Sequence, residues 1–590
     1  MPGQRDDVLQ QAALQFGAGH FAHAVSLLLP LLARSPRDAS LRVNLGLCRQ
    51  RMGDLPAAEI LYREAISLDA GFAQAWTALG DLLREAGKPE AAYEALQRAL
   101  LLAPDEAGAH LGLGLLLQQY GRVGEAVTAL RRALVHDPAA ADTWCNLGMA
   151  LQDAGAIAEA LAAYRKALAL APGHRAAASN LLMAMQYDTS KSARELREAA
   201  AAWGRCVAVE TAHGTRAPRK PGRLRVGYVS GDFAMHPVGW FFLPVAQAHD
   251  KAVVESYCYV NQARRDDMTA RIEVAVEHWR DIRALEDDAA CRLIEADGID
   301  VLVDLSGHTS GGRMGVFARK PAPLQFSWLG YFASTGLACI DAVILGGEQA
   351  GPGGQAFFVE PIEALARPHF CYAPPDYAPP VRARTADRGR VVVFGSFGNL
   401  AKLNDDVIRL WSKVLAAVPD SRLLLKWKTL ADPAGRAELV ARFARAGCPV
   451  ERLELRGPSE HAAMLAEYGD IDVALDPFPF SGALTTCEAL WMGVPVVTLQ
   501  SLRPVSRQSA ALLRCIGLDN LVAATADGYI DIARRLAGDA SRLEQLRSGL
   551  RAQVGASPLG DAIGLARALE AVYLRHAAKA GLSGLDARRA

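Results

Sequence analysis

Two hydroxyls and a carboxylate lie close together late in the chain, at Thr485, Thr486 and Glu488. They follow a short apolar run (residues 472–476) and a loop broken by Pro and Gly, and they open a helical pattern that stops at Gly493. Because a helix N-terminus offers unpaired N–H groups and the positive end of a dipole, this stretch is suited to hold a diphosphate. Glu488, one turn inside, could accept hydrogen bonds from a ribose diol. The same spacing also fits a capping box, in which Thr485 and Glu488 serve only the helix.

A lysine follows another apolar run in a similar position. Residues 391–394 read as a strand. The motif Phe-Gly-Ser-Phe-Gly-Asn-Leu-Ala-Lys begins at the last residue of this strand and ends at Lys402. A fixed ammonium beside the helix that begins near Thr485 could neutralise the charge that develops on a departing diphosphate. The alternative is a surface lysine that packs its aliphatic stem and keeps its ammonium in water.

A histidine is held on a loop after the first strand of the α/β region. Pro237 disfavours helical backbone angles at the residue before it, so His236 is expected on a loop rather than within a helix. An imidazole in a crevice can act as a general base or orient an acceptor, because its pKa lies near physiological pH. The alternative is a structural histidine.

Two further loops carry donors and small residues directly after strands. The first spans residues 304–313 and contains His308, and the second spans residues 325–336 and contains Thr335. Their glycines permit close approach of the backbone to a ligand, so both residues are candidates for donor binding. The Asp-Ile-Asp sequence at residues 470–472 begins a strand, far from these loops, and is interpreted as surface charge. The sequence therefore predicts neither a metal site nor a cofactor.

The elements that must position these residues alternate between apolar runs and helical patterns from residue 224 onward. Continuous apolar strands separated by helices are typical of parallel sheets, and a Pro-rich break at residues 374–380 divides them into two doubly wound domains. A ligand is expected in the crevice at the carboxyl ends of the strands. The predicted strands are 224–230, 253–260, 301–305, 324–329 and 342–345 in the first domain, and 391–394, 422–426, 453–455, 473–475 and 496–499 in the second.

The first third of the chain is repetitive, with a period of 34 residues. Each unit reads as two amphipathic helices, and the pattern resembles the tetratricopeptide repeat, an α-solenoid that holds peptides or partner proteins in a groove. The first glycine of each unit is expected to let the paired helices approach closely, and the second to turn the chain between them. The repeated positions are Gly46, Gly80, Gly114 and Gly148, then Gly53, Gly87, Gly121 and Gly155, then Ala58, Ala92, Ala126 and Ala160.

Composition excludes several classes of protein. The chain has 590 residues with 64 basic and 64 acidic side chains, so no global field favours nucleic acid or an anionic membrane. The ten cysteines contain no CxxC pair, which is typical of reduced thiols in the cytoplasm. The first residues lack the apolar core of a signal peptide, and no apolar run is long enough to span a bilayer. We expect a cytoplasmic protein that binds neither nucleic acid nor membrane.

Taken together, the motifs resemble those of the intracellular protein O-linked N-acetylglucosamine transferases and their SPINDLY-type relatives, over nearly the whole chain. The resemblance implies a GT-B fold and an inverting, metal-independent transfer of a sugar from a nucleotide sugar, UDP-N-acetylglucosamine favoured, to Ser or Thr of a protein bound along the repeat groove. It implies roles for five residues: His236 as the active-site loop histidine, Lys402 on the donor diphosphate, Asn399 on the nucleotide, Thr485 on phosphate and Glu488 on the ribose. The motifs are Ser-Gly-Asp-Phe-x-x-His-Pro, Leu-Ser-Gly-His-Thr, Pro-Ala-Pro-Leu-Gln-x-x-Trp-Leu-Gly-Tyr, Phe-Gly-Ser-Phe-x-Asn-Leu-Ala-Lys and Thr-Thr-Cys-Glu-Ala-Leu-Trp-Met-Gly-Val-Pro.

The chain departs from the family pattern in the donor loop, where Ala483 and Leu484 replace residues with polar side chains, and in residues 344–352. Glu488 in place of Asp is similar to the SPINDLY-type and bacterial branch, so a protein O-fucosyltransferase that uses GDP-fucose is an alternative. A binding scaffold with a weakened catalytic cleft is another. The predicted domains are a solenoid (1–185), a helical junction and linker (186–222), two Rossmann-like halves (223–380 and 381–555), and a C-terminal helix and tail (556–590).

Overall fold

The structure, a computed structural model, describes residues 2–208, 222–383 and 391–582. The later part of the predicted helical junction and linker (186–222) lies outside these residues, and so does the end of the predicted tail. The chain divides into two compact units. One comprises residues 1–154, 162–174 and 431–435, and the other comprises residues 155–161, 175–430 and 436–590.

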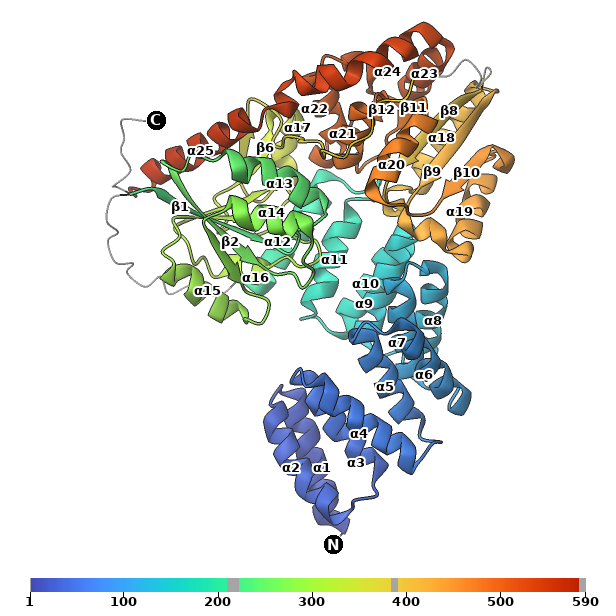
Figure 1. Cartoon of the computed structure of the whole chain (residues 1–590), viewed down its shortest axis with the longest axis vertical. Coiled ribbons are helices and arrows are strands. Elements are labelled where there is room, and N and C mark those ends of the chain that lie inside the picture. The colour runs from blue at the N-terminus through green and yellow to red at the C-terminus, as the bar shows by residue number, and fades with distance from the viewer. Residues whose placement is uncertain (1, 209–221, 384–390, 583–590) are drawn as a thin grey trace. The chain divides into compact units, whose positions relative to one another are not determined.

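The N-terminal helices form pairs that follow the 34-residue period (Figure 1). A Cβ atom on Gly46 would lie 2.4 Å from the ring of Tyr62, and one on Gly80 would lie 2.6 Å from Leu96, so no side chain fits at this position of the first helix. The turn glycines have positive φ, for example 82° at Gly53. The predicted tetratricopeptide solenoid is confirmed. Its helices are α1 (Pro2–Gly17), α2 (Phe21–Arg34), α3 (Ala39–Arg51), α4 (Leu55–Leu68), α5 (Ala73–Glu85), α6 (Pro89–Leu102), α7 (Ala107–Gln119), α8 (Val123–His136), α9 (Ala141–Asp153) and α10 (Ile157–Leu170).

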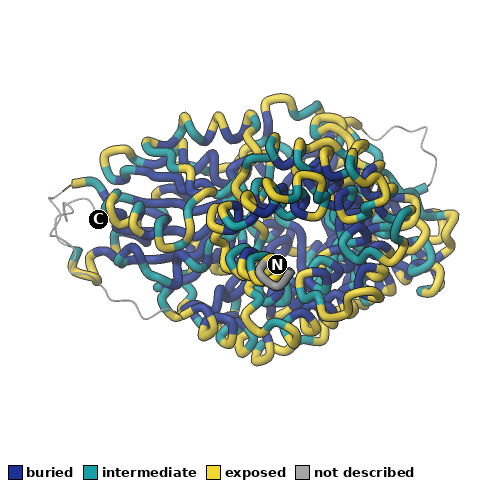
Figure 2. The backbone as a smooth tube through the Cα atoms, turned by 90° about the horizontal axis from the view of Figure 1, so that it is seen from below, coloured by how far each residue is buried: buried dark blue, intermediate teal, exposed yellow. Residues whose placement is uncertain are grey.

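Two helices, α11 (Arg175–Met185) and α12 (Ala193–Val207), precede the first lobe, which we define as residues 222–383. Its seven strands are all parallel, in the order β3-β2-β1-β4-β5-β6-β7. Every residue of β4, β5 and β6 is buried, and Figure 2 draws such residues in dark blue. The strands are β1 (Leu224–Ser230), β2 (Val254–Val260), β3 (His278–Asp281), β4 (Val301–Asp304), β5 (Leu324–Trp328), β6 (Ala342–Gly346) and β7 (Ile362–Leu365). The helices are α13 (Pro237–Ala248), α14 (Asp267–Ala275), α15 (Asp287–Ala296), α16 (Met314–Ala318) and α17 (Gly347–Ala350).

The second lobe, residues 391–555, holds a parallel sheet in the order β10-β9-β8-β11-β12-β13. The two doubly wound domains predicted from the apolar runs are confirmed. The strands are β8 (Val392–Phe397), β9 (Ser421–Lys426), β10 (Leu453–Arg456), β11 (Val473–Leu475), β12 (Val496–Leu499) and β13 (Val522–Ala523). The helices are α18 (Asp405–Ala417), α19 (Pro433–Arg445), α20 (His461–Glu467), α21 (Leu484–Trp491), α22 (Gln508–Cys515), α23 (Ala526–Gly538) and α24 (Ala540–Gly555), with short 3-10 turns η3 (Leu400–Lys402) and η4 (Lys428–Ala431).

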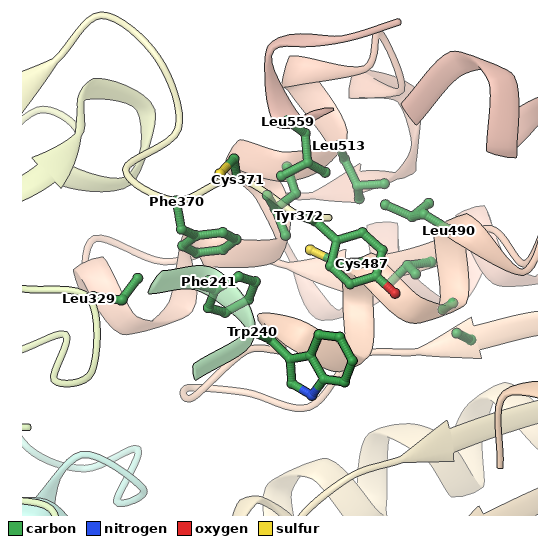
Figure 3. Packing of buried hydrophobic residues seen from close by; sticks show 14 of the residues in the cluster. Trp240, Phe241, Leu329, Phe370, Cys371, Tyr372, Cys487, Leu490, Leu513 and Leu559 are labelled. Carbon is green, nitrogen blue, oxygen red and sulfur yellow. The ribbon is translucent and has the colours of Figure 1, made fainter. Parts of the chain in front are cut away.

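An apolar layer joins the two lobes (Figure 3). Trp240 and Phe241 of α13 meet Phe370 and Tyr372, which follow β7 near the end of the first lobe, and Cys487 lies beside them on α21 of the second lobe. The rings of Phe241 and Phe370 stack with their centroids 4.2 Å apart. Burial of this apolar surface stabilises one arrangement of the lobes and so fixes the loops at their edges.

The last helix, α25 (Ala562–Lys579), packs against α13 of the first lobe (Figure 1). The contact includes buried polar groups, because Nδ1 of His249 lies 2.9 Å from Oε1 of Glu570, and its Nε2 lies 2.7 Å from the hydroxyl of Tyr228. The C-terminal end of α13 is therefore held by β1 and α25. These contacts fix the helix that begins directly after His236. In the part of the chain that the structure describes, no helix is long and apolar enough to cross a bilayer.

Candidate functional site

A cavity of about 430 Å³ lies where the loops after the parallel strands meet. Its walls come from the loops after β1, β4 and β5 of the first lobe and after β8, β9 and β11 of the second. In the first sheet the chain order runs outward from β1 toward β3 on one side and from β4 toward β7 on the other. In the second sheet it runs outward from β8 toward β10 on one side and from β11 toward β13 on the other. The cavity therefore occupies the topological switch points, where open α/β sheets bind ligands.

Lys402 occupies the second-lobe wall of this cavity. Its Nζ donates to the carbonyl oxygen of Ser481 at 2.8 Å and lies 4.5 Å from the centre of the Phe480 ring. Burial lowers the pKa of Lys402 to about 8, and the nearby carboxylate of Asp476 counteracts this shift. Asn399 also lines the cavity, and its side chain accepts from the N–H of Ala401 at 3.0 Å, which caps the turn η3 that carries Lys402.

The start of α21 forms the adjoining part of the same wall. Thr485 and Thr486 both line the cavity, and the hydroxyl of Thr486 lies 2.8 Å from that of Ser509. A Cβ atom on Gly482 would lie 2.4 Å from the Thr486 hydroxyl and 3.1 Å from that of Thr485, so glycine is required there. The helix is preceded by Ala483, whose side chain caps nothing. The capping-box interpretation of Thr485 is therefore wrong, because the helix begins one residue earlier than that motif needs.

Glu488 lies behind this wall rather than on it. Only 2% of the residue is exposed, and its Oε1 lies 2.9 Å from Nε2 of His461. Burial raises the pKa of Glu488, and the hydrogen bond with His461 opposes this. Nδ1 of His461 lies 2.7 Å from the Tyr377 hydroxyl, and its ring is 5.4 Å from that of Trp240. A ribose could reach the Glu488 carboxylate only if His461 moved.

His236 lines the same cavity from the first lobe. It is the residue before α13, and its Nδ1 accepts weakly from the N–H of Val238 at 3.4 Å. The same Nδ1 lies 3.7 Å from Oδ1 of Asp232. Burial lowers the pKa of His236, Asp232 raises it, and Lys428 lowers it. A mostly neutral imidazole therefore faces a cationic wall.

His308 and Thr335 lie outside this cavity, among packed side chains. His308 is 2% exposed; its Nε2 lies 2.9 Å from the Thr335 carbonyl oxygen, and its Nδ1 lies 3.1 Å from the hydroxyl of Ser179 on α11. Its ring meets the Trp203 ring of α12 edge-on at 4.4 Å. Burial lowers the pKa of His308 to about 4. The Thr335 hydroxyl donates to the buried Glu360. Both side chains therefore stabilise the packing of the first-lobe loops against their neighbours.

The two departures from the family pattern have different locations. Ala483 and Leu484 line the cavity, so its second-lobe wall carries apolar groups beside Thr485. Residues 344–352 form the end of β6 and the short helix α17, and they border a different cavity of about 370 Å³. The second departure therefore does not touch the cavity that contains Lys402.

The Asp-Ile-Asp sequence lies at the amino end of β11. Asp470 pairs with Arg456 and Arg382, and Asp472 accepts from the N–H of Val393. Asp470 therefore pairs with a residue of β10 and Asp472 bonds to the backbone of β8, so both carboxylates stabilise the second sheet. Within residues 2–208, 222–383 and 391–582, no group of three or more His, Cys, Asp or Glu side chains is arranged to hold a metal.

Sequence reasoning missed three residues at the site. Asp476 is buried after β11 and accepts from the N–H of Gly482 at 2.7 Å, which shapes the loop before α21. His461 starts α20 and carries no motif of its own, yet it contacts Glu488. Lys428 is an exposed residue that lines the cavity after β9. Its position at a strand end is the one signal that could have identified it.

Comparisons with known proteins agree with this architecture. The model of glycosyl transferase family 41 matches residues 206–353 and 381–568, and tetratricopeptide repeat models match residues 9–72, 83–144 and 141–174. The chain is 34% identical over 400 residues to a protein of Solanum lycopersicum named probable UDP-N-acetylglucosamine–peptide N-acetylglucosaminyltransferase SPINDLY, covering 66% of this chain and 43% of that protein. It is 30% identical over 371 residues to the Arabidopsis thaliana protein of the same description named SEC, covering 60% and 37%.

The chain spans about two fifths of the length of these curated relatives. Among solved structures, a mutant O-GlcNAc transferase of Thermobaculum terrenum superposes with a TM-score of 0.80 at 37% identity, covering 87% of this chain and 98% of that one. The family match extends over more than half of the chain and includes every strand that borders the cavity. This chain belongs to glycosyl transferase family 41.

Proposed function

We propose that this protein transfers a sugar from a nucleotide sugar to Ser or Thr side chains of proteins. The supporting observation is that Lys402 and the start of α21, from the second lobe, line one cavity together with His236 from the first lobe. An ammonium beside a helix N-terminus suits a diphosphate leaving group. An imidazole across from it suits the hydroxyl that attacks the sugar.

The donor is proposed to lie with its diphosphate between Lys402, Thr485 and Thr486. Asn399 holds the turn beneath it, and the nucleoside extends toward His461 and Glu488. His461 moves away from Glu488 in this proposal, so that the carboxylate receives the ribose hydroxyls. UDP-N-acetylglucosamine is the favoured donor, because the curated relatives and the solved relative are named for that sugar. His308 and Thr335 act indirectly in this proposal, by holding the loops of the first lobe.

The transfer is proposed to invert the anomeric carbon and to need no metal. The acceptor hydroxyl attacks from the side of His236 while the diphosphate leaves toward Lys402, so the nucleophile and the leaving group lie on opposite faces of the sugar. Lys402 and the dipole of α21 supply positive charge to the leaving group. Activity is expected to persist after exhaustive treatment with a chelator, and loss that returns on addition of a divalent cation would contradict this.

The acceptor is proposed to be an extended segment of a protein that lies along the groove of the tetratricopeptide repeats, as solenoids of this kind commonly bind.

Incubation with a panel of nucleotide sugars and Ser/Thr-containing peptides tests this function. Mass spectrometry of the peptide identifies the transferred sugar, and site mapping distinguishes a hydroxyl from an amide linkage. Transfer of N-acetylglucosamine supports the proposal, whereas transfer of fucose from GDP-fucose would establish the alternative donor. Ala483 and Leu484 favour a third reading, a scaffold with a weakened site, which predicts no transfer from any donor.

A further inference from the structure

We propose that Asp232 is a positioning residue that holds the His236 imidazole in the tautomer able to accept the proton of the acceptor hydroxyl. The inference rests on the proposed function of the cavity and names a residue that acts through His236. Asp232 and His236 lie four residues apart on the loop between β1 and α13. Of this loop, His236 lines the cavity that also contains Lys402, and Asp232 lies behind it.

Two groups compete for Nδ1 of His236. The N–H of Val238 approaches it at 3.4 Å as a donor, and Oδ1 of Asp232 lies 3.7 Å away as an acceptor. If Nδ1 accepts from Val238, the proton of a neutral imidazole sits on Nε2, and that nitrogen can only donate. If Nδ1 carries the proton and directs it at Asp232, Nε2 has a free lone pair. Only the second arrangement gives a base.

The local backbone holds the two side chains in this relation. The N–H of Asp232 donates to the hydroxyl of Ser230 at 2.9 Å, and the N–H of Met235 donates to Asp266 at 2.9 Å. Asp266 also caps α14 through the N–H of Thr269. The loop is therefore tied at both ends, with Oδ1 of Asp232 3.7 Å from Nδ1 of His236.

The charged groups around His236 act in opposite directions. Asp232, on the same loop, raises the pKa of the imidazole, and Lys428, across the cavity on η4, lowers it. Burial raises the pKa of Asp232, and His236 lowers it. Because Asp232 faces His236 and Lys428 belongs to the other lobe, the two can be altered separately.

The proposed transfer breaks two bonds and forms two. The O–H bond of the acceptor breaks, its proton moves to Nε2 of His236, and the oxygen forms the bond to the anomeric carbon. The bond from that carbon to the donor oxygen breaks, and its electron pair leaves with the diphosphate. The resulting imidazolium is stabilised by Asp232 until its proton passes to water.

The kinetic test compares wild type, Asp232→Asn, His236→Ala and the double variant. Asp232→Asn is expected to lower kcat by about 10- to 100-fold with little change in the KM for the donor. The acidic limb of the pH profile is expected to move to lower pH by about 0.5–1 unit, because the imidazole loses an anionic neighbour. Lys428→Met should move the same limb to higher pH. In the His236→Ala background, Asp232→Asn should have no further effect.

An equal loss of kcat in both backgrounds would overturn the proposal, because Asp232 would then act independently of His236. An unchanged kcat in Asp232→Asn would also overturn it. A wild-type protein that transfers no sugar would contradict the proposed function, and a spectroscopic measurement then tests Asp232 by itself.

That measurement is a nitrogen NMR spectrum of histidine-labelled full-length protein, with the His236 signals identified by their loss in His236→Ala. The proposal predicts that neutral His236 is protonated mainly at Nδ1 in the wild type and mainly at Nε2 in Asp232→Asn. Protonation at Nε2 in both proteins would overturn it, whether or not the enzyme turns over.

Discussion

Lys402 is the residue on which the proposed donor site depends most. Its ammonium is partly buried, bonded to the Ser481 carbonyl and placed over the Phe480 ring, so it is fixed before any donor arrives. A charge held in advance costs no reorganisation when the diphosphate develops its charge. The low pKa of about 8 reflects the burial of this cation.

Replacement of Lys402 by Ala is therefore expected to lower kcat by roughly 10²–10³-fold, the scale for loss of one preorganised electrostatic contact. Lys413 is exposed on α18 and serves as the matched control, since Lys413→Ala should leave kcat unchanged. Steady-state transfer kinetics of both variants measure the difference. Near-normal turnover in Lys402→Ala would remove Lys402 from the chemistry.

The same lysine predicts a pH dependence of nucleotide binding. Below its pKa of about 8 the ammonium is charged and attracts the diphosphate, and above that pH the free protein loses the charge. The Kd for a nucleoside diphosphate should therefore rise with pH above 8, approaching about tenfold per pH unit. Lys402→Arg should flatten this rise, because a guanidinium stays protonated. Calorimetry measures this Kd across the pH range. A wild-type Kd that stays constant with pH would contradict the prediction.

The candidate site residues selected from the sequence fall into two groups, one that lines the cavity and one that is packed in the protein interior. His236, Asn399, Lys402, Thr485 and Thr486 line one cavity, because each follows a strand whose end the apolar pattern marks. His308 and Thr335 follow strands too, yet their polar atoms face the protein interior. Strand position alone cannot distinguish these cases, since the partner Ser179 comes from a helix more than a hundred residues away.

At the scale of elements, His308 joins the helices before the first lobe to that lobe. It contacts Ser179 on α11, Trp203 on α12 and the carbonyl of Thr335. Nearby, a Cβ atom on Gly204 would lie 1.8 Å from the carbonyl oxygen of Gly336, so α12 lies directly against the loop after β5. The imidazole thus connects three elements at a point of tight packing.

His308→Ala is expected to cost about 2–3 kcal/mol of unfolding free energy, because it leaves a cavity and two polar groups without partners. The KM for the donor should change little. Thermal unfolding together with donor kinetics tests this, and His23→Ala, at an exposed position, is the control. A large rise in the donor KM without loss of stability would instead place His308 in contact with the donor.

The strand pattern could be predicted from the sequence where strands are buried on both faces. The runs at β1, β9 and β12 were found nearly to the residue because burial demands continuous apolar side chains. The sequence did not predict β3, β7 and β13, which lie at or near sheet edges. β3 reads His-Trp-Arg-Asp and is only partly buried, and β13 has two residues, so neither carries an apolar run.

At the scale of the whole molecule, the repeats are expected to bind the protein substrate and the two lobes to bind the donor. Deletion of residues 1–174, which ends directly before α11, should lower transfer to protein substrates far more than hydrolysis of the donor. Glycosylation of a protein and release of free nucleotide are measured on the same preparation, with nucleotide binding as the control for folding. Equal loss of both activities would mean that the repeats contribute only to folding.

The central claim is that a nucleoside diphosphate binds at Lys402 and the start of α21. Thermal unfolding of wild type and Lys402→Ala with UDP, GDP and their sugars tests it most directly. One nucleotide should stabilise the wild type, by about 2.7 kcal/mol at a concentration 100 times its Kd, and should stabilise Lys402→Ala much less. No stabilisation by any nucleotide, or equal stabilisation of both proteins, would contradict the claim.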